Sequence, residues 1–470
     1  MDDRLQLPPR RQALWVSDGR PRARFYPLAL LEQKADTLLT IGQWPAGERI
    51  LRRNLAWLRR SGLTGHLAPA CNQLGGLLYE KGSYPEALVL FRRAEAIYRR
   101  RGDLLGVAQC LSNIAGIHHN HGRYIRAMAC LRRALSLARS AGDRQRISQY
   151  TGNIGIIYYQ MGDHARAIAC YRRTLSIAEE LDLGHLALAA VGNLALAFLG
   201  RGDYGRALEH NQRYLRLARA QGNAQVISYA IGNLGSLYYD LDRYQEAMAA
   251  FREHRDISLQ LGDKPGRILA ADNIGSVYLA WGMHDQALQH FTESLHLSRE
   301  LDNHEDAARA LTHIGNLRSA MGDDRRALDC YRKSARELEK SDSDYYRCYT
   351  LHHQARLLYR LGRAGLARRA NTKARELAVR LCAHEMIVNT AILEASLLPG
   401  DESSKAVPVL KAAMRQARTN RQKALVRFEL ARTTGKKSDA AKARDMLQAL
   451  YRLSGNKEYL RMIDDLTNRI

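Results

Sequence analysis

Proline is scarce in this sequence, with 10 prolines in 470 residues. Few prolines leave room for long helices, and the abundant alanine, leucine and arginine lose little conformational freedom in a helix. No stretch reaches the ~18 uninterrupted apolar residues of a membrane span, and residues 1–20 carry no apolar core of signal-peptide length. We therefore expect a helical, soluble protein of the cytoplasm.

A pairing pattern among the cysteines is also missing. The 7 cysteines are odd in number and include no Cys-x-x-Cys pair, which argues against a disulfide framework or a zinc site. One histidine cluster, formed by His118, His119 and His121, lacks a cysteine or carboxylate at ligand spacing. We expect free thiols in a reducing compartment, no metal and no other cofactor.

Catalytic signatures are absent too. The sequence holds no Walker phosphate loop, no His-Glu-x-x-His, no Gly-x-Ser-x-Gly, and no His-x-Glu combined with Cys-x-x-Cys. Its carboxylates near arginines are typical of ion pairs on helix surfaces. We expect a protein that binds other molecules and is not an enzyme.

Positive charge dominates the composition. Lys and Arg number 72 against 48 Asp and Glu, which gives a formal net charge of +24. Such a field attracts acidic proteins, nucleic acid or anionic lipid, and charge alone does not choose among them. Because arginine richness also arises from coding bias, a non-functional origin stays open as well.

The chain repeats itself every 40 residues. One phase of the repeat carries asparagine, at Asn113, Asn153, Asn193, Asn233 and Asn273. A second phase carries glycine and is broken only at Asp242; its members are Gly42, Gly82, Gly122, Gly162, Gly202, Gly282, Gly322 and Gly362. Such a fixed period is typical of a solenoid that grows by stacking units.

Each repeat predicts a helical hairpin. In residues 145–182 the apolar spacing is helical in two segments, which predicts helices over 146–160 and 165–180. Gly162 suits the left-handed residue that ends the first helix. Ala167 followed four residues later by Tyr171 places a small and a large side chain on one face of the second helix, as close helix packing requires.

This pattern resembles the tetratricopeptide repeat in its long form, similar to Pins/LGN-type adaptors and bacterial repeat proteins of signalling systems. The residues that carry the resemblance are Ile154, Gly155, Tyr158, Ala167 and Tyr171 and their equivalents in other units. No C-terminal GoLoco-like segment of the polarity adaptors is present. The resemblance implies an all-α, right-handed superhelical solenoid.

We divide the chain by how closely each segment matches the 40-residue pattern. The parts are a poorly ordered N-terminal extension (1–24), a degenerate first repeat (25–62), eight 40-residue repeats (63–382), degenerate helical repeats (383–455) and a C-terminal cap (456–470). Within the degenerate region we expect helices over 404–418, 422–432 and 439–453.

The resemblance implies that the first helix of each hairpin lines a concave groove. An asparagine amide has one acceptor and two donors, so a ladder of them can hold the backbone of a partner segment, extended or helical. The predicted groove residues are Asn113, Asn153, Asn193, Asn233, Asn273, Tyr159, Ser236, Tyr239, Ser276, Asn316 and Arg356. Arg309, Arg356 and Arg360 suggest that an acidic end or a C-terminal carboxylate end of a ligand lies there. The alternative is that the asparagines only tie neighbouring hairpins together.

Three functions stay open at this stage. The first is a protein-interaction scaffold or adaptor, and the second is a regulatory or sensor module that acts on an effector in trans. The third is binding of RNA or an anionic surface by a convex ridge of arginine pairs. The ridge comprises Arg92 with Arg93, Arg132 with Arg133, Arg172 with Arg173, and Arg332 with Lys333. A solvated helix face is the simpler interpretation of these pairs.

Overall fold

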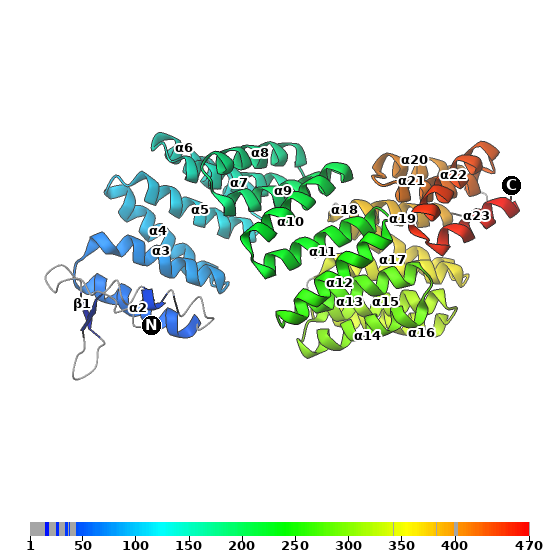
Figure 1. Cartoon of the computed structure of the whole chain (residues 1–470), viewed down its shortest axis with the longest axis horizontal. Helices are drawn as coiled ribbons and strands as arrows, with labels where there is room; N and C mark the ends of the chain where they lie inside the picture. The colour runs from blue at the N-terminus through cyan, green and yellow to red at the C-terminus, as the bar shows by residue number, and fades with distance from the viewer. Residues whose placement is uncertain are drawn as a thin grey trace. The chain divides into compact units, whose positions relative to one another are not determined.

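The computed structural model describes residues 15–17, 25–27, 33–35, 37, 44–341, 343–381, 383–398 and 403–469. The chain forms two compact units, Met1–Asn193 and Leu194–Ile470. Within each unit, successive helices run antiparallel and stack on one another (Figure 1). The predicted all-α solenoid of helical hairpins is confirmed in both units.

The first unit contains strands β1 (Trp15–Ser17) and β2 (Phe25–Pro27), which pair antiparallel with Trp15 opposite Pro27. Its helices are α2 (Trp44–Arg60), α3 (Thr64–Glu80), α4 (Tyr84–Arg100), α5 (Leu104–Asn120), α6 (Tyr124–Ser140), α7 (Arg144–Gln160), α8 (His164–Glu180) and the start of α9 (Gly184–Arg201). Residues 15–17, in the extension expected to be poorly ordered, form β1, and residues 25–27 of the expected first helical repeat form β2. Residues 1–14 and 18–24 of that extension, and Gly42, lie outside the described residues.

The second unit continues the hairpins and ends in shorter helices. It holds α10 (Tyr204–Gln221), α11 (Ala224–Asp240), α12 (Tyr244–Gln260), α13 (Lys264–Ala280), α14 (His284–Glu300), α15 (His304–Ala320), α16 (Asp324–Leu338), α17 (Asp344–Arg360), α18 (Ala364–Arg380), α19 (His384–Ser396), α20 (Ser403–Gln416), α21 (Asn420–Thr434), α22 (Lys437–Ser454) and α23 (Lys457–Arg469). The helices predicted over 404–418, 422–432 and 439–453 correspond to α20, α21 and α22. Helix α23 lies within the segment 456–470 that we expected to be the C-terminal cap.

A glycine and an aspartate connect the two helices of a hairpin. Gly162 has φ 76° and its N–H donates to Tyr159 O at 2.9 Å, which ends α7. The carboxylate of Asp163 accepts the N–H of Arg166 at 3.0 Å and so caps the start of α8. Asp143 caps α7 in the same way, which explains why α7 begins two residues before the predicted start at 146.

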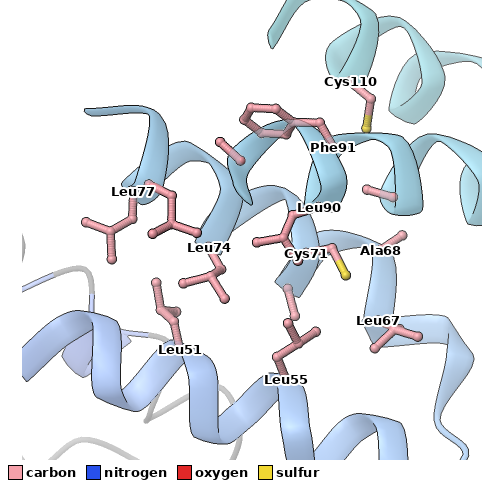
Figure 2. Close-up of a cluster of buried hydrophobic side chains, with 14 of the residues drawn as sticks. Leu51, Leu55, Leu67, Ala68, Cys71, Leu74, Leu77, Leu90, Phe91 and Cys110 are labelled. Carbon is pink, nitrogen blue, oxygen red and sulfur yellow. The ribbon is translucent and has the colours of Figure 1, made fainter. Parts of the chain in front are cut away.

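Small residues let the two helices of a hairpin approach closely. In the first unit, Ala87 and Phe91 of α4 are fully buried, and the ring of Phe91 lies against Gly75 of α3. Figure 2 shows Phe91 in the core that α2 and α3 complete with Leu51, Leu55 and Leu74. The same pairing recurs in the second unit between Gly235 and Phe251, Gly275 and Phe291, and Gly315 and Tyr331.

One described helix, α9, is long and apolar enough to cross a membrane by length and composition alone. The core helix of a soluble protein meets the same test. Leu194 and Phe198 of α9 are fully buried at the positions that the repeat assigns to the core. We therefore interpret α9 as a repeat helix.

Candidate partner-binding surface

Two of the five ladder asparagines tie consecutive first helices together. The amide of Asn113 on α5 donates to Asn72 Oδ1 on α3 at 2.9 Å. The amide of Asn153 on α7 donates to Ser112 Oγ on α5 at 3.4 Å. At these two positions the asparagine therefore connects neighbouring hairpins, as the alternative hypothesis predicted.

The other three ladder asparagines lack such a tie. The residue 41 positions earlier, Asn72 or Ser112 in the tied pairs, is glycine for each of the three: Gly152, Gly192 and Gly232. Within the described part of the chain, the amides of Asn193, Asn233 and Asn273 have no hydrogen-bond partner. Asn233 is exposed, and Asn193 and Asn273 are half-buried. The donors and acceptors of these three amides are therefore unused within the described part of the chain.

The two predicted serines lie one helical turn beyond the untied asparagines. Ser236 Oγ on α11 donates to Gly232 O at 3.1 Å, and Ser276 Oγ on α13 donates to Asp272 O at 2.9 Å. A hydroxyl that has donated its proton can still accept. Helices α11 and α13 contact each other directly, so these side chains belong to one wall.

The predicted groove residues Asn316 and Tyr159 have structural partners. Asn316 Oδ1 accepts the hydroxyl of the core ring Tyr331 at 2.8 Å. The ring of Tyr159 meets the edge of His164 with centroids 5.3 Å apart. Both side chains therefore also serve packing within their own hairpins.

The arginines that suggested an acidic ligand are paired inside the chain. Arg309, which is 11% exposed, contacts Asp272 at 2.5 Å and Asp306 at 2.8 Å. Arg360 pairs with Asp324, and Arg356 lies 3.6 Å from Glu458. Because each guanidinium already has a carboxylate, these residues give no support to an acidic ligand in the groove.

The end of the chain folds back onto the second unit. Tyr459 on α23 donates its hydroxyl to Asp242 Oδ1 at 2.8 Å, and Tyr244 donates to the same oxygen at 2.9 Å. The amide of Asn456 lies 3.5 Å from the Tyr244 hydroxyl. Asp242 is 1% exposed, so this carboxylate is enclosed by the residues that bind it.

Further contacts join the last helices to the turns of earlier hairpins. Trp281 Nε1 donates to Ser454 O at 3.1 Å, and the Arg418 guanidinium donates to Gly200 O. Together with the ion pair between Arg356 and Glu458, these contacts hold α21–α23 against the unit. We call the whole set the C-terminal clasp: Gly200, Asp242, Tyr244, Trp281, Arg356, Arg418, Ser454, Asn456, Glu458 and Tyr459.

Burial raises the pKa of two acids beside the clasp. It raises the pKa of Asp240, at the end of α11, to about 7, with Glu385 adding to the rise and Arg421 opposing it. Burial also raises the pKa of Asp242, against the effect of Arg421 and of the tyrosine hydroxyls. The predicted groove residue Tyr239 stacks on Tyr244 next to these acids, with centroids 5.1 Å apart.

The basic ridge and the histidine cluster are solvated or locally bonded. All eight ridge residues are exposed, and Lys333 pairs with Asp329 at 2.8 Å. The pKa of His118 is lowered by burial and then by nearby arginines, and His121 Nδ1 lies 2.8 Å from Ile117 O. In the described residues no group of three or more His, Cys, Asp or Glu side chains could hold a metal ion.

Sequence reasoning missed the C-terminal clasp. Asp242 adopts a φ of 58°, where the other hairpins have glycine, and its side chain carries the contacts that glycine could not make. The interruption of the glycine phase was therefore the one available signal. Tyr459 itself lies in a segment without the repeat and gave none.

These helical hairpins are joined by Gly-Asp turns, and small residues of one helix pack against large side chains of the other. Such hairpins define a helical-repeat protein. The family model for the tetratricopeptide repeat matches more than half of the chain, at residues 66–140, 146–220, 226–300 and 284–340. The chain belongs to the tetratricopeptide-repeat family and is a protein-interaction or regulatory module. The family model of anaphase-promoting complex subunit 5 also matches, at residues 326–435. No curated protein matches the chain.

Solved structures of similar fold are numerous, and three of them serve as examples. A Rap protein complexed with competence and sporulation factor is 15% identical, with 76% of this chain and 98% of that chain covered and a TM-score of 0.51. Aspartyl phosphate phosphatase F from Bacillus subtilis is 14% identical over 74% and 93% of the two chains, with a TM-score of 0.52. A signal transduction ATPase with a tetratricopeptide-repeat sensor, from Pyrococcus horikoshii, is 13% identical over 72% and 54%, with a TM-score of 0.52. At these identities the likeness concerns the fold alone.

Proposed function

We propose that this protein is a non-catalytic adaptor that holds a segment of a partner protein against the wall formed by α11 and α13. The observation that carries the proposal is the pair of untied amides of Asn233 and Asn273 at one phase of neighbouring helices. An amide with unused donors and acceptors can bond to a peptide backbone without reading its side chains.

The chemistry of the neighbouring positions supports a protein ligand. Ser236 and Ser276 add acceptor oxygens one turn from the asparagines, and the exposed Tyr229 adds aromatic contact area on α11. Tyrosine supplies a large contact with few rotors to freeze, as is typical of recognition surfaces. The Rap protein of similar fold is described as complexed with competence and sporulation factor, which agrees with ligand capture by such a fold.

A cytoplasmic location is part of the proposal. The six described cysteines, Cys71, Cys110, Cys130, Cys170, Cys330 and Cys348, are all free thiols. Free thiols persist where the surroundings are reducing.

A regulatory role in trans is the second candidate, and the clasp favours it. Arg356, which belongs to the predicted groove set, is paired with Glu458 of α23. A partner that binds Arg356 would therefore compete with the last helix of the chain. Hydrogen exchange of α23 with and without bound partner tests this role, since competition predicts faster exchange in the complex.

Site-specific photocrosslinking tests the groove. A benzophenone amino acid replaces Ser236 in the full chain, and a matched variant carries it at the exposed Arg133 on α6. We expect a protein partner crosslinked from position 236 that is lost when Asn233 and Asn273 are changed to alanine. The Asn113→Ala variant serves as the control, since Asn113 has a structural tie. Crosslinking that persists in the double variant, or that is equal from position 133, would overturn the proposal.

A further inference from the structure

A second surface differs from the groove in chemistry and position. A cavity of about 270 Å³ lies between α16 and α18, with α17 as its floor. Its aliphatic lining consists of Leu328, Leu351, Leu358 and Leu366. The volume falls below the roughly 300–1,000 Å³ of small-molecule pockets, which favours anchoring side chains of a larger partner.

Substitutions in one repeat create this hollow. At the phase of Leu358 four other hairpins place a Tyr or Phe ring, at Tyr158, Phe198, Tyr238 and Tyr278, so the shorter leucine leaves space. At the phase of Gln354, the seven preceding hairpins each place leucine or isoleucine: Leu74, Ile114, Ile154, Leu194, Leu234, Ile274 and Ile314. Among these repeats the combination of Gln354 and Leu358 occurs only in the α17–α18 hairpin.

Leu366 extends the apolar lining to the surface. It is 49% exposed on α18. Every earlier repeat has a polar residue at this phase: Glu86, Arg126, Arg166, Arg206, Glu246, Gln286 and Arg326. Leu366, which stands where the other repeats place a polar residue, adds apolar surface at the mouth of the cavity that a ligand could bury.

Cations without partners surround the cavity. Arg332, Arg363, Arg369 and Lys373 line it, all are exposed, and none forms an ion pair with a carboxylate in the described part of the chain. The lining includes no Asp or Glu. A larger cavity of about 630 Å³ on the other side of α18 differs in this respect, because Arg375 there pairs with Glu394 and Arg368 donates to Leu397 O.

We propose that the α16–α18 cavity is a docking site for an acidic amphipathic helix of a partner protein. Leucine-type side chains of the partner enter the hollow beside Leu366, and its flanking carboxylates meet the four cations. A protein fits this surface better than RNA does, because the lining has no aromatic side chain on which a base could stack. This site is independent of the α11–α13 wall.

The test uses the full-length protein and a fluorescent synthetic peptide. The peptide carries leucine at i, i+3, i+4 and i+7 and glutamate elsewhere, and a scrambled peptide of the same composition controls for charge alone. Oligouridine serves as the nucleic-acid probe. We expect the amphipathic peptide to bind, the scrambled peptide to bind at least tenfold more weakly, and oligouridine not to compete.

Two variants locate the site. Leu366→Glu introduces a residue that other repeats carry at this phase, so the hairpin should fold, which circular dichroism checks. Arg332→Glu with Lys373→Glu reverses two of the cations, and Arg92→Glu with Arg93→Glu makes the same change at the same phases in another repeat. Binding should fall about tenfold or more in the first two variants and stay unchanged in the control. Equal binding by all variants, equal binding of the scrambled peptide, no peptide binding, or binding of oligouridine alone would overturn the proposal.

Discussion

The hydroxyl of Tyr459 donates a 2.8 Å hydrogen bond to the carboxylate of Asp242, which lies 217 residues earlier in the chain. Solenoid repeats usually contact only their neighbours, so stability is local and ends fray. The clasp changes this for the second unit, because its last helix is held by an early turn. Local opening of α23 must then break a buried hydrogen bond.

Tyr459→Phe removes that bond and keeps the ring. A hydrogen bond contributes about 0.5–1.5 kcal/mol, or up to about 3 kcal/mol when one partner is charged, and we expect a loss within this range in the stability of α23. Hydrogen exchange of the amides in Lys457–Arg469 measures the opening. Tyr451→Phe on α22 is the control, since its hydroxyl has no partner among the described residues. Equal protection of α23 in both variants would contradict the role of the bond.

Asp242→Gly restores the glycine of the repeat but should destabilise the protein. Glycine relieves the left-handed backbone, which costs about 1 kcal/mol for other residues. The change also leaves the hydroxyls of Tyr244 and Tyr459 without their hydrogen-bond acceptor, which costs about 1–3 kcal/mol for each unsatisfied group. Asp182→Gly is the matched control: Asp182 has φ 52°, is exposed and has no side-chain partner in the described structure, so glycine should stabilise there. Urea unfolding measures the change in unfolding free energy of both variants. A change of the same sign in Asp242→Gly and Asp182→Gly would refute this account.

Asp240 makes the second unit less stable as pH rises. Its folded pKa is raised to about 7, mainly by burial, above the roughly 3.9 of an unfolded aspartate. Between these values the folded state keeps a proton that the unfolded state has lost, so this contribution to stability is full below about pH 4 and lost by about pH 7. We expect Asp240→Asn to gain stability relative to wild type across this range. Urea midpoints at several pH values check it, and parallel pH profiles would count against the assignment.

The hairpins could be predicted because the residues that determine them lie close in sequence. Gly155 and Tyr171, whose atoms pack in one hairpin, are 16 positions apart, and a pair of glycine and aromatic ring recurs at this spacing in five of the eight repeats. The clasp could not be predicted, since Tyr459 shares no period with Asp242. The asparagine ladder could be predicted only in part. Its asparagines look equivalent, yet only the structure shows that the residue 41 positions earlier decides whether an amide is tied.

Alanine substitutions at two adjacent glycines of α3, Gly75 and Gly76, test the packing of the core. We expect them to change the stability of the first unit in opposite directions. A Cβ on Gly75 would lie 2.8 Å from Cε1 and 2.9 Å from Cδ1 of Phe91, whereas a Cβ on Gly76 would meet nothing within 4 Å. Phe91 is fully buried and cannot move away, so Gly75→Ala should destabilise the first unit by about 1–3 kcal/mol through overpacking. Gly76→Ala should stabilise it by roughly 0.5–1 kcal/mol, because alanine loses less backbone entropy in a helix. Thermal unfolding of the two variants decides the matter. Stabilisation by both substitutions would mean that α3 and α4 can separate to admit a methyl group, and that the small-to-large pairing is not what sets their distance.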